Sequence, residues 1–128
     1  MVLGFTKTMM VNGKRKPTDF EEKIKKGIKL HTVRWDDKDR WKLGMKIHFA
    51  TDVRSSRYNC FKEGVCKGTQ KIAIEDDAVY VDGIQLTESE LTDFAVNDGF
   101  DSVSDFWDWF NQYQPFKGKI IHWTNILY

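Results

Sequence analysis

The sequence contains few residues of the kinds that define disulfide-rich, metal-binding or membrane proteins. Only two cysteines, Cys60 and Cys66, and two prolines occur among its 128 residues. Two thiols without paired histidines nearby cannot complete a zinc site, and no Walker loop, dinucleotide fingerprint or metal-ligand cluster is present. No apolar run approaches the roughly 20 residues of a membrane-spanning helix, and residues 1–7 do not resemble a signal peptide. We therefore expect a soluble cytoplasmic protein with free thiols, no metal and no cofactor.

The sequence does contain enough apolar and aromatic side chains for one folded domain. Hydrophobic residues make up 41% of the chain and aromatic residues 14%, which excludes an intrinsically disordered protein. A chain of 128 residues has the size of one ordinary domain and can bury a core. No repeat, low-complexity segment or long linker divides it. We expect a single domain over residues 1–128.

The charges balance overall but are unevenly distributed. The formal net charge is +1, yet residues 1–46 carry 13 Lys and Arg against 6 Asp and Glu, whereas residues 75–108 carry 11 acidic residues and no Lys or Arg. Proteins that bind long nucleic acids are usually basic as a whole, so the basic third favours contact with a few phosphates or a small anionic ligand. The acidic region offers a docking face for a protein partner. The alternative is that the two regions interleave in the fold and their charges mix.

Alternating patterns along the chain predict strands separated by turns and helices. Seven segments read as strands, at about 2–10, 30–34, 46–51, 58–66, 70–74, 79–81 and 117–124. Strands thus outnumber helices, and turn signals recur every several residues. This order predicts an α+β fold, a small mixed β-barrel with two or three flanking helices.

Three capping signals locate the expected helices. Capping boxes that begin at Thr18 and Thr87 predict two of them, and Ser102 can cap a third. In the third helix one face forms an apolar stripe that is typical of core packing, made of Val103, Phe106, Trp107 and Phe110. Trp109 lies off this stripe and is therefore the aromatic residue of that helix with the greater interest for ligand binding.

The segment from Gly27 to Arg34 (GIKLHTVR) concentrates polar side chains at a helix-to-strand junction. In a regular strand Thr32 and Arg34 point to one face, and Lys29 and His31 point to the other. Strand twist and the freedom of the first residue would let Lys29 lean towards Thr32. An amine, a hydroxyl and a guanidinium placed together suit an anion, a polarised carbonyl or a base edge. His31 faces away from Thr32 and is interpreted as structural, and a solvated edge strand is the alternative for the whole segment.

This segment also carries a family resemblance. Its pattern G-x-K-x-x-T-x-R, together with Asp98-Gly99-Phe100, resembles the ASCH (activating signal cointegrator homology) domain of the PUA-like superfamily. Further matching motifs are FEEKI at 20–24, RWKLG at 40–44, DFWDWF at 105–110 and HWT at 122–124. The resemblance covers roughly Gly4 to Tyr128. It implies a PUA-like barrel that binds RNA or a nucleotide-like ligand in a cleft formed by the G-x-K-x-x-T-x-R segment and Asp98.

Each polar residue of this cleft has a predicted role in ligand binding. Lys29 and Arg34 would hold a phosphate, or Arg34 would contact a base. Thr32 and Asp98 would read the edge of that base. The four residues therefore need to converge on one concave site, although Asp98 is far from the others in the sequence.

Two tryptophans in the charged loop over residues 35–44 are further candidates for ligand contacts. Trp35 and Trp41 would each stack on an exposed base, and a good stack is worth about 1–3 kcal/mol. Trp35 directly follows Arg34 and is the preferred contact. Trp41 has the alternative role of a lid that packs over the fold.

The resemblance also implies an enzymatic alternative. The superfamily includes a small bacterial amidohydrolase that removes the acetyl group from acetylcytidine with a Lys, a Thr and a Glu. By the shared motif, Lys29 and Thr32 take the first two roles, and Asp98, one methylene shorter than Glu, takes the third. A Thr becomes a nucleophile when a base takes its proton, and a Lys is such a base only when neutral, so burial or nearby Arg34 must lower its pKa from about 10.4. An amidohydrolase acting on an acylated cytidine-type nucleoside, or a ribonuclease using the same cleft, is thus the alternative.

Overall fold

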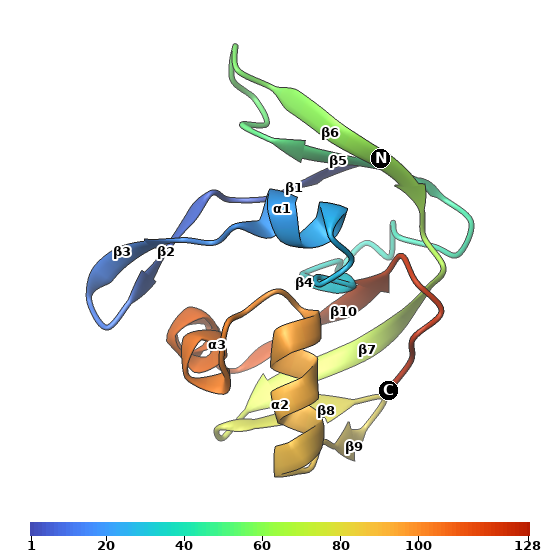
Figure 1. Ribbon diagram of the computed structural model, residues 1–128. Helices are drawn as coiled ribbons and strands as arrows, with labels where there is room; N and C mark the ends of the chain where they lie inside the picture. Colours follow the sequence, from blue (N-terminus) through green and yellow to red (C-terminus); the bar gives the residue numbers. More distant parts are fainter.

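Residues 59–75 join the two larger sheets of the protein. The computed structural model describes residues 1–128. Strand β6 (Asn59–Val65) belongs to a three-stranded sheet, and strand β7 (Gly68–Glu75) belongs to a five-stranded sheet. Between them, the N–H of Cys66 donates to Met45 O (2.7 Å), but the N–H of Lys67 donates to His122 O (2.8 Å). The chain therefore passes from one sheet to the other within two residues (Figure 1).

The five-stranded sheet has the order β4-β10-β7-β8-β9 and is antiparallel throughout. Its remaining strands are β4 (His31–Arg34), β8 (Ala78–Val81), β9 (Ile84–Gln85) and β10 (Phe116–His122). On β7 the alternation is clear, because Ile72 and Ile74 are buried while Lys71 and Glu75 are exposed. One face of this sheet is thus apolar. Helices lie over the sheet in Figure 1.

The N-terminal third supplies strands to two smaller sheets. In the three-stranded sheet β1 (Val2–Gly4) is parallel to β5 (Lys46–Thr51), which pairs antiparallel with β6. Strands β2 (Thr8–Val11) and β3 (Lys14–Pro17) form a hairpin that extends to one side of the molecule (Figure 1). The strand predicted over residues 2–10 is therefore two strands, β1 and β2, which belong to different sheets.

The predicted small mixed β-barrel is wrong, because the sheets remain open. Strands β1 and β4 are edge strands, each with a single hydrogen-bonded neighbour. Between these edges Arg34 on β4 donates through Nη2 to the carbonyl oxygen of Gly4 on β1 (2.6 Å). An arginine side chain that bridges two backbones keeps them farther apart than the roughly 4.8 Å of paired strands. The fold is α+β, with three open sheets and three α-helices.

The second and third predicted helices begin where their capping signals indicate. In α2 (Glu88–Asn97) the Thr87 hydroxyl accepts from the N–H of Glu90 (3.2 Å), and the Glu90 carboxylate accepts from the N–H of Thr87 (2.9 Å). In α3 (Val103–Phe110) the Ser102 hydroxyl accepts from the N–H of Asp105 (3.1 Å). A 3₁₀ turn, η1 (Asn111–Tyr113), follows α3. Both capping predictions are confirmed.

The capping box predicted at Thr18 is wrong. Helix α1 (Phe20–Lys25) starts after Asp19, which has a left-handed φ of 55° and makes no side-chain capping bond. The Thr18 hydroxyl accepts from the N–H of Phe20 (3.4 Å) and donates to the carbonyl oxygen of Thr6 (2.7 Å). The helix begins one residue later than the capping box requires, because Asp19 and not Thr18 is its N-cap.

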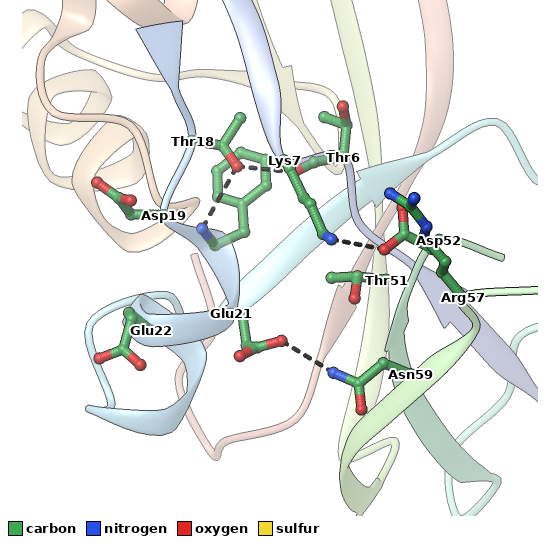
Figure 2. Close-up of a pocket in the computed structure, with 11 residues that line it drawn as sticks. Thr6, Lys7, Thr18, Asp19, Glu21, Glu22, Thr51, Asp52, Arg57 and Asn59 are labelled. Carbon is green, nitrogen blue, oxygen red and sulfur yellow. Dashed lines mark hydrogen bonds and ion pairs between the residues drawn. The ribbon is translucent and has the colours of Figure 1, made fainter.

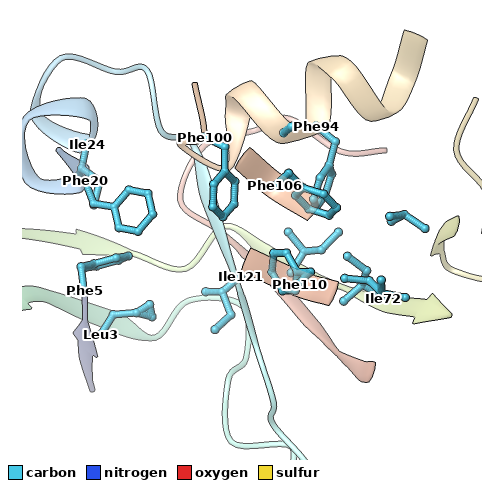
Figure 3. Close-up of a cluster of buried hydrophobic side chains, with 14 of the residues drawn as sticks. Leu3, Phe5, Phe20, Ile24, Ile72, Phe94, Phe100, Phe106, Phe110 and Ile121 are labelled. Carbon is cyan, nitrogen blue, oxygen red and sulfur yellow. The ribbon is translucent and has the colours of Figure 1, made fainter. Parts of the chain in front are cut away.

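A single cluster of 20 buried apolar residues forms the core (Figure 3). Helices α2 and α3 cover the five-stranded sheet, and the rings of Phe94, Phe100 and Phe106 meet edge to face, with Phe94 and Phe100 centroids 5.9 and 5.7 Å from that of Phe106. The predicted stripe of α3 is confirmed, because Phe106 and Phe110 are fully buried. Trp41 also belongs to this cluster.

The basic and acidic regions interleave, as the alternative interpretation of the charge pattern predicted. Lys16 on β3 forms ion pairs with Asp101 (2.7 Å) and Asp105 (2.6 Å), and Lys23 on α1 pairs with Asp101 (2.6 Å). Part of the positive charge of residues 1–46 is therefore neutralised inside the molecule. The part of the acidic region that forms α2 keeps Glu88, Glu90 and Asp93 exposed.

The two cysteines differ in burial. Cys60 is exposed and Cys66 is buried, and both are free thiols. Burial raises the pKa of the Cys66 thiol, which lowers its reactivity.

None of the helices combines the length and the apolar character that crossing a membrane requires.

Candidate functional site

A cavity of about 260 Å³ lies beside the gap between β1 and β4, and the four polar residues predicted for the cleft all line it. These are Lys29, Thr32, Arg34 and Asp98, and the apolar part of the wall comes mainly from Phe5, Phe20, Phe100, Trp109 and Phe110. The predicted convergence of Asp98 with the other three residues is therefore confirmed as geometry. A small set of polar groups inside an aromatic wall is the usual composition of a small-molecule site.

The loop between α1 and β4 carries Lys29 into the interior. Gly27 ends α1 with a φ of 74°, and the N–H of Lys29 donates to Lys23 O (3.0 Å). The next residue, Leu30, donates its N–H to the carbonyl oxygen of Asn97 at the end of α2 (2.7 Å). These bonds fix the loop at both ends. Lys29 is consequently only 1% exposed, although lysine is almost never fully buried without a partner.

Asp98 and two aromatic rings surround the Lys29 ammonium. Its Nζ donates a short hydrogen bond to the backbone oxygen of Asp98 and lies 3.7 Å from Oδ1 of the same residue. It also lies 4.5 Å from the centroid of the Phe20 ring and 5.7 Å from that of Phe5. Ring faces attract cations, and this attraction strengthens when water is excluded. The cavity thus holds its lysine by one carbonyl, one carboxylate and two π faces.

Burial lowers the pKa of Lys29 to about 8. Loss of hydration disfavours the ammonium most, and repulsion from Arg34 and Lys23 acts in the same direction. The attraction to Asp98 opposes these effects without cancelling them. An unperturbed lysine has a pKa near 10.4, so Lys29 has an appreciable neutral fraction near neutral pH. A neutral amine is what Lys29 needs in order to act as a base.

His31 holds the carboxylate of Asp98 from the side away from the cavity. Its Nδ1 lies 3.0 Å from Oδ1 of Asp98, and its Nε2 lies 2.6 Å from the hydroxyl of Tyr128, which also accepts from Nδ2 of Asn97 (2.9 Å). These partners assign the proton to Nδ1, because Tyr128 then donates to Nε2. The sequence interpretation of His31 as structural missed its bond to Asp98, which no local signal reveals.

A second buried histidine packs behind His31. The ring of His122 lies 5.3 Å from that of His31, and its Nε2 is 3.0 Å from Oε1 of Gln70. Its Nδ1 has no partner. Burial, followed by repulsion from a charged His31, lowers the pKa of His122 to about 4. Burial also lowers the pKa of His31, so both rings are neutral at pH 7.

Arg34 and Thr32 are the two polar residues that β4 contributes to the cavity wall. Arg34 uses Nη2 on Gly4 and lies 5.2 Å from the centroid of the Phe5 ring, but its buried Nε has no hydrogen-bond partner. Thr32 is 6% exposed and lines the cavity. A buried donor without a partner costs roughly 1–3 kcal/mol. A ligand acceptor at Arg34 would remove that cost.

Gly99 is the residue that lets the cavity close around Lys29. Its φ is +97°, and a Cβ atom there would lie 2.8 Å from Cδ of Lys29 and 3.0 Å from the Phe20 ring. The Asp98-Gly99-Phe100 motif therefore contributes a carboxylate, a close backbone approach and a wall of the cavity in three consecutive residues. Only glycine combines this backbone conformation with this space.

Neither tryptophan of the 35–44 loop reaches the cavity. Trp41 is 7% exposed and is part of the core, where it contributes packing instead of a ligand contact. Trp35 is 71% exposed and lines other hollows of the surface. The tryptophan at the cavity is Trp109. Its position off the apolar stripe of α3 was the sequence signal for it.

A larger, polar hollow of about 520 Å³ adjoins the cavity and shares Thr6 and Phe20 with it (Figure 2). Lys7 pairs with Asp52 across it (2.5 Å), and Nδ2 of Asn59 donates to Glu21 (3.3 Å). Its ionic side chains are Lys7 and Arg57 against Asp19, Glu21, Glu22 and Asp52. The excess of carboxylates makes this hollow unsuitable for a phosphate, and the smaller cavity has the buried polar groups that define a site.

Comparison of the chain with protein-family models, with curated proteins and with solved structures finds no match. The resemblance to ASCH domains therefore rests on the motifs alone.

Replacing Gly99 with alanine will test how tightly the cavity is built. Gly83 provides a matched control, because its φ is +83° but a Cβ there has nothing within 4 Å. We expect Gly83→Ala to lose about 1 kcal/mol of unfolding free energy from backbone strain alone. Gly99→Ala should lose about 1–3 kcal/mol more, because Lys29 and Phe20 must move. Equal losses in urea denaturation of the two variants would show that the contact with Lys29 is not tight.

The buried histidines make stability dependent on pH. The pKa of His122 is about 4 in the folded protein and about 6.5 in the unfolded chain. The unfolded state therefore binds more protons below about pH 6.5, and the free energy of unfolding decreases as the pH is lowered. Between pH 7.5 and 5 this loss is about 2 kcal/mol for His122. His122→Phe should therefore show a shallower fall in unfolding free energy over this range. Parallel curves for the two proteins would contradict the assignment.

Proposed function

We propose that the protein binds a nucleoside or a nucleotide-like ligand in the cavity around Lys29. The observation that carries this proposal is the combination of buried polar groups and aromatic walls. A planar base fits between rings, as unstacked bases do in other proteins. The volume of about 260 Å³ is smaller than most drug-sized pockets. It therefore suits one base or one nucleoside and excludes an oligonucleotide.

The charges favour a base carbonyl over a phosphate as the group that meets the polar floor. The Lys29 ammonium already donates to Asp98, and Arg34 is already bonded to Gly4. Strong phosphate binding needs full charges and several free donors. A carbonyl oxygen needs a single good donor, which the Arg34 guanidinium in the cavity wall can provide. Thr32 and Asp98 then supply a hydroxyl and a carboxylate for the remaining edge.

Isothermal titration with cytidine, uridine and their monophosphates tests this proposal. We expect a nucleoside to bind, and we expect its monophosphate to bind with nearly the same affinity. Thr32→Val should weaken binding by about 1 kcal/mol, the worth of one hydrogen bond. The matched control is Thr92→Val, because Thr92 is exposed on α2 and its hydroxyl bonds only to Glu88 O. Absence of nucleoside binding, or equal affinities for the two variants, would contradict the proposal.

A second candidate function is the deacylation of an acylated cytidine-type nucleoside. The lowered pKa of Lys29 favours it, because a neutral amine can take the proton of the Thr32 hydroxyl. The Thr32 oxygen would then attack the acyl carbonyl, and Arg34 would stabilise the oxyanion. The proton taken by Lys29 would pass through Asp98 to the leaving amine, and water would then hydrolyse the acyl ester on Thr32. Lys29 is bonded to Asp98 in the structure, so this reaction needs Lys29 to turn towards Thr32, and we place it second.

The hydrolase mechanism predicts a distinctive pH profile. Turnover of acetylcytidine, followed by mass spectrometry, should rise with pH and level off above about pH 8, where Lys29 is neutral. Lys29→Ala and Lys29→Arg should both abolish it, because a guanidinium keeps its proton. Near-full activity of Lys29→Arg would rule out lysine as the base. Binding of the nucleoside without any turnover would leave the cavity as a recognition site.

A further inference from the structure

The five-stranded sheet carries a second candidate site on its outer face, which is turned away from α2 and α3. Cross-strand neighbours share a face, so Lys117 on β10, Ala73 on β7 and Tyr80 on β8 form one row across three strands. Lys71 precedes Ala73 on the same face, and Trp35 stands at the end of β4. We refer to Trp35, Lys71, Ala73, Tyr80 and Lys117 as the outer platform.

The outer platform is hollowed around Trp35. A hollow of about 460 Å³ lies over the sheet, where Ala73 and Gly118 leave space between the longer side chains. A second hollow of about 560 Å³ is formed with Tyr113, Pro115 and Phe116. Trp35 and Lys117 line both hollows. The indole, 71% exposed, therefore borders open space on two sides, which is the placement that a stacking residue needs.

The free charges of the outer platform are mainly positive. Lys119 is held by Asp36 (3.3 Å) and Asp39, and Asp36 also accepts from the N–H groups of Arg40 and Trp41. Lys71 and Lys117, by contrast, are exposed and take part in no ion pair. Asp37 is the carboxylate at the rim that has no cation partner. Two free ammonium groups beside two aromatic rings are complementary to an anionic chain that carries planar groups.

We propose that the outer platform binds single-stranded nucleic acid, with bases stacked on Trp35 and Tyr80 and phosphates held by Lys71 and Lys117. A polymer is the better occupant, because β4 and β8 are three strand spacings apart, about 14 Å, more than one base covers. Basic grooves with aromatic platforms bind single strands in this way. The hollow over the sheet shares no residue with the Lys29 cavity. The proposal thus goes beyond the nucleoside site and does not depend on it.

Fluorescence anisotropy with a labelled oligouridylate of about eight nucleotides measures the contribution of stacking. Trp35→Ala should weaken binding about tenfold or more, as loss of a base stack does. Leu43→Ala is the matched control, because Leu43 lies in the same loop and is 74% exposed. It should leave the affinity unchanged. Circular dichroism checks that both variants stay folded, which the exposure of both side chains favours.

A pair of charge reversals measures the phosphate contacts. Lys117→Glu and Lys46→Glu change the net charge equally, but Lys46 lies on β5 in the other sheet, is exposed and has no ion pair. Lys117→Glu should weaken binding and reduce the salt dependence by about 0.7 in the log–log slope, the value for one phosphate on a single strand. Lys46→Glu should keep the original slope. Equal effects would show non-specific attraction and overturn the proposal.

The cavity variant Thr32→Val separates this proposal from the nucleoside site. It should leave oligouridylate affinity unchanged, and Trp35→Ala should leave nucleoside affinity unchanged. The proposal would be overturned if Thr32→Val lost oligouridylate binding while Trp35→Ala kept it, because the polymer would then bind at the cavity. Equal binding of an uncharged oligosaccharide of similar length would also overturn it, because the lysines would then have no role.

Discussion

The burial of Lys29 is the constraint on which the rest of the site depends. Removing an ammonium group from water costs several kcal/mol unless partners compensate, and Lys29 is 1% exposed. The compensation comes from the Asp98 carbonyl and carboxylate and from the ring of Phe20. Asp98 is held in turn by His31. The loop after α1, the end of α2 and the start of β4 are therefore fixed together, and the incomplete compensation is what lowers the pKa of Lys29.

Internal pairing also determines which charges remain for partners. The sequence places most of its positive charge in residues 1–46, but Lys16 and Lys23 neutralise acidic residues of the C-terminal half, and Lys29 is buried. The lysines that remain free, beside the exposed Trp35 and the half-buried Tyr80, are Lys71 and Lys117, outside that basic third. A charge pattern in the sequence thus identifies a binding surface only after ion pairs within the fold have been accounted for. The two opposite charges of an ion pair largely cancel for an approaching partner.

Local signals predicted much of the fold because they involve neighbouring residues. The capping box at Thr87 closes on Glu90 three residues later, and no distant group competes for either side chain. The similar signal at Thr18 failed because the helix begins one residue later, with Asp19 as its N-cap. The barrel prediction failed because strand pairing joins segments that are distant in the sequence. Whether β1 pairs with β4 depends on what lies between them, and Arg34 occupies that space.

The sequence by itself determined the helix-to-strand junction at Gly27, the polar set Lys29, Thr32 and Arg34, and the turn at Asp98-Gly99, because each is a property of a few consecutive residues. Tertiary structure decided that Asp98 reaches Lys29 across 69 positions and that His31 holds it. It also decided that Trp41 enters the core while Trp35 stays on the surface, although both lie in one loop. Burial depends on which distant segments meet, and no pattern of neighbouring residues encodes that meeting.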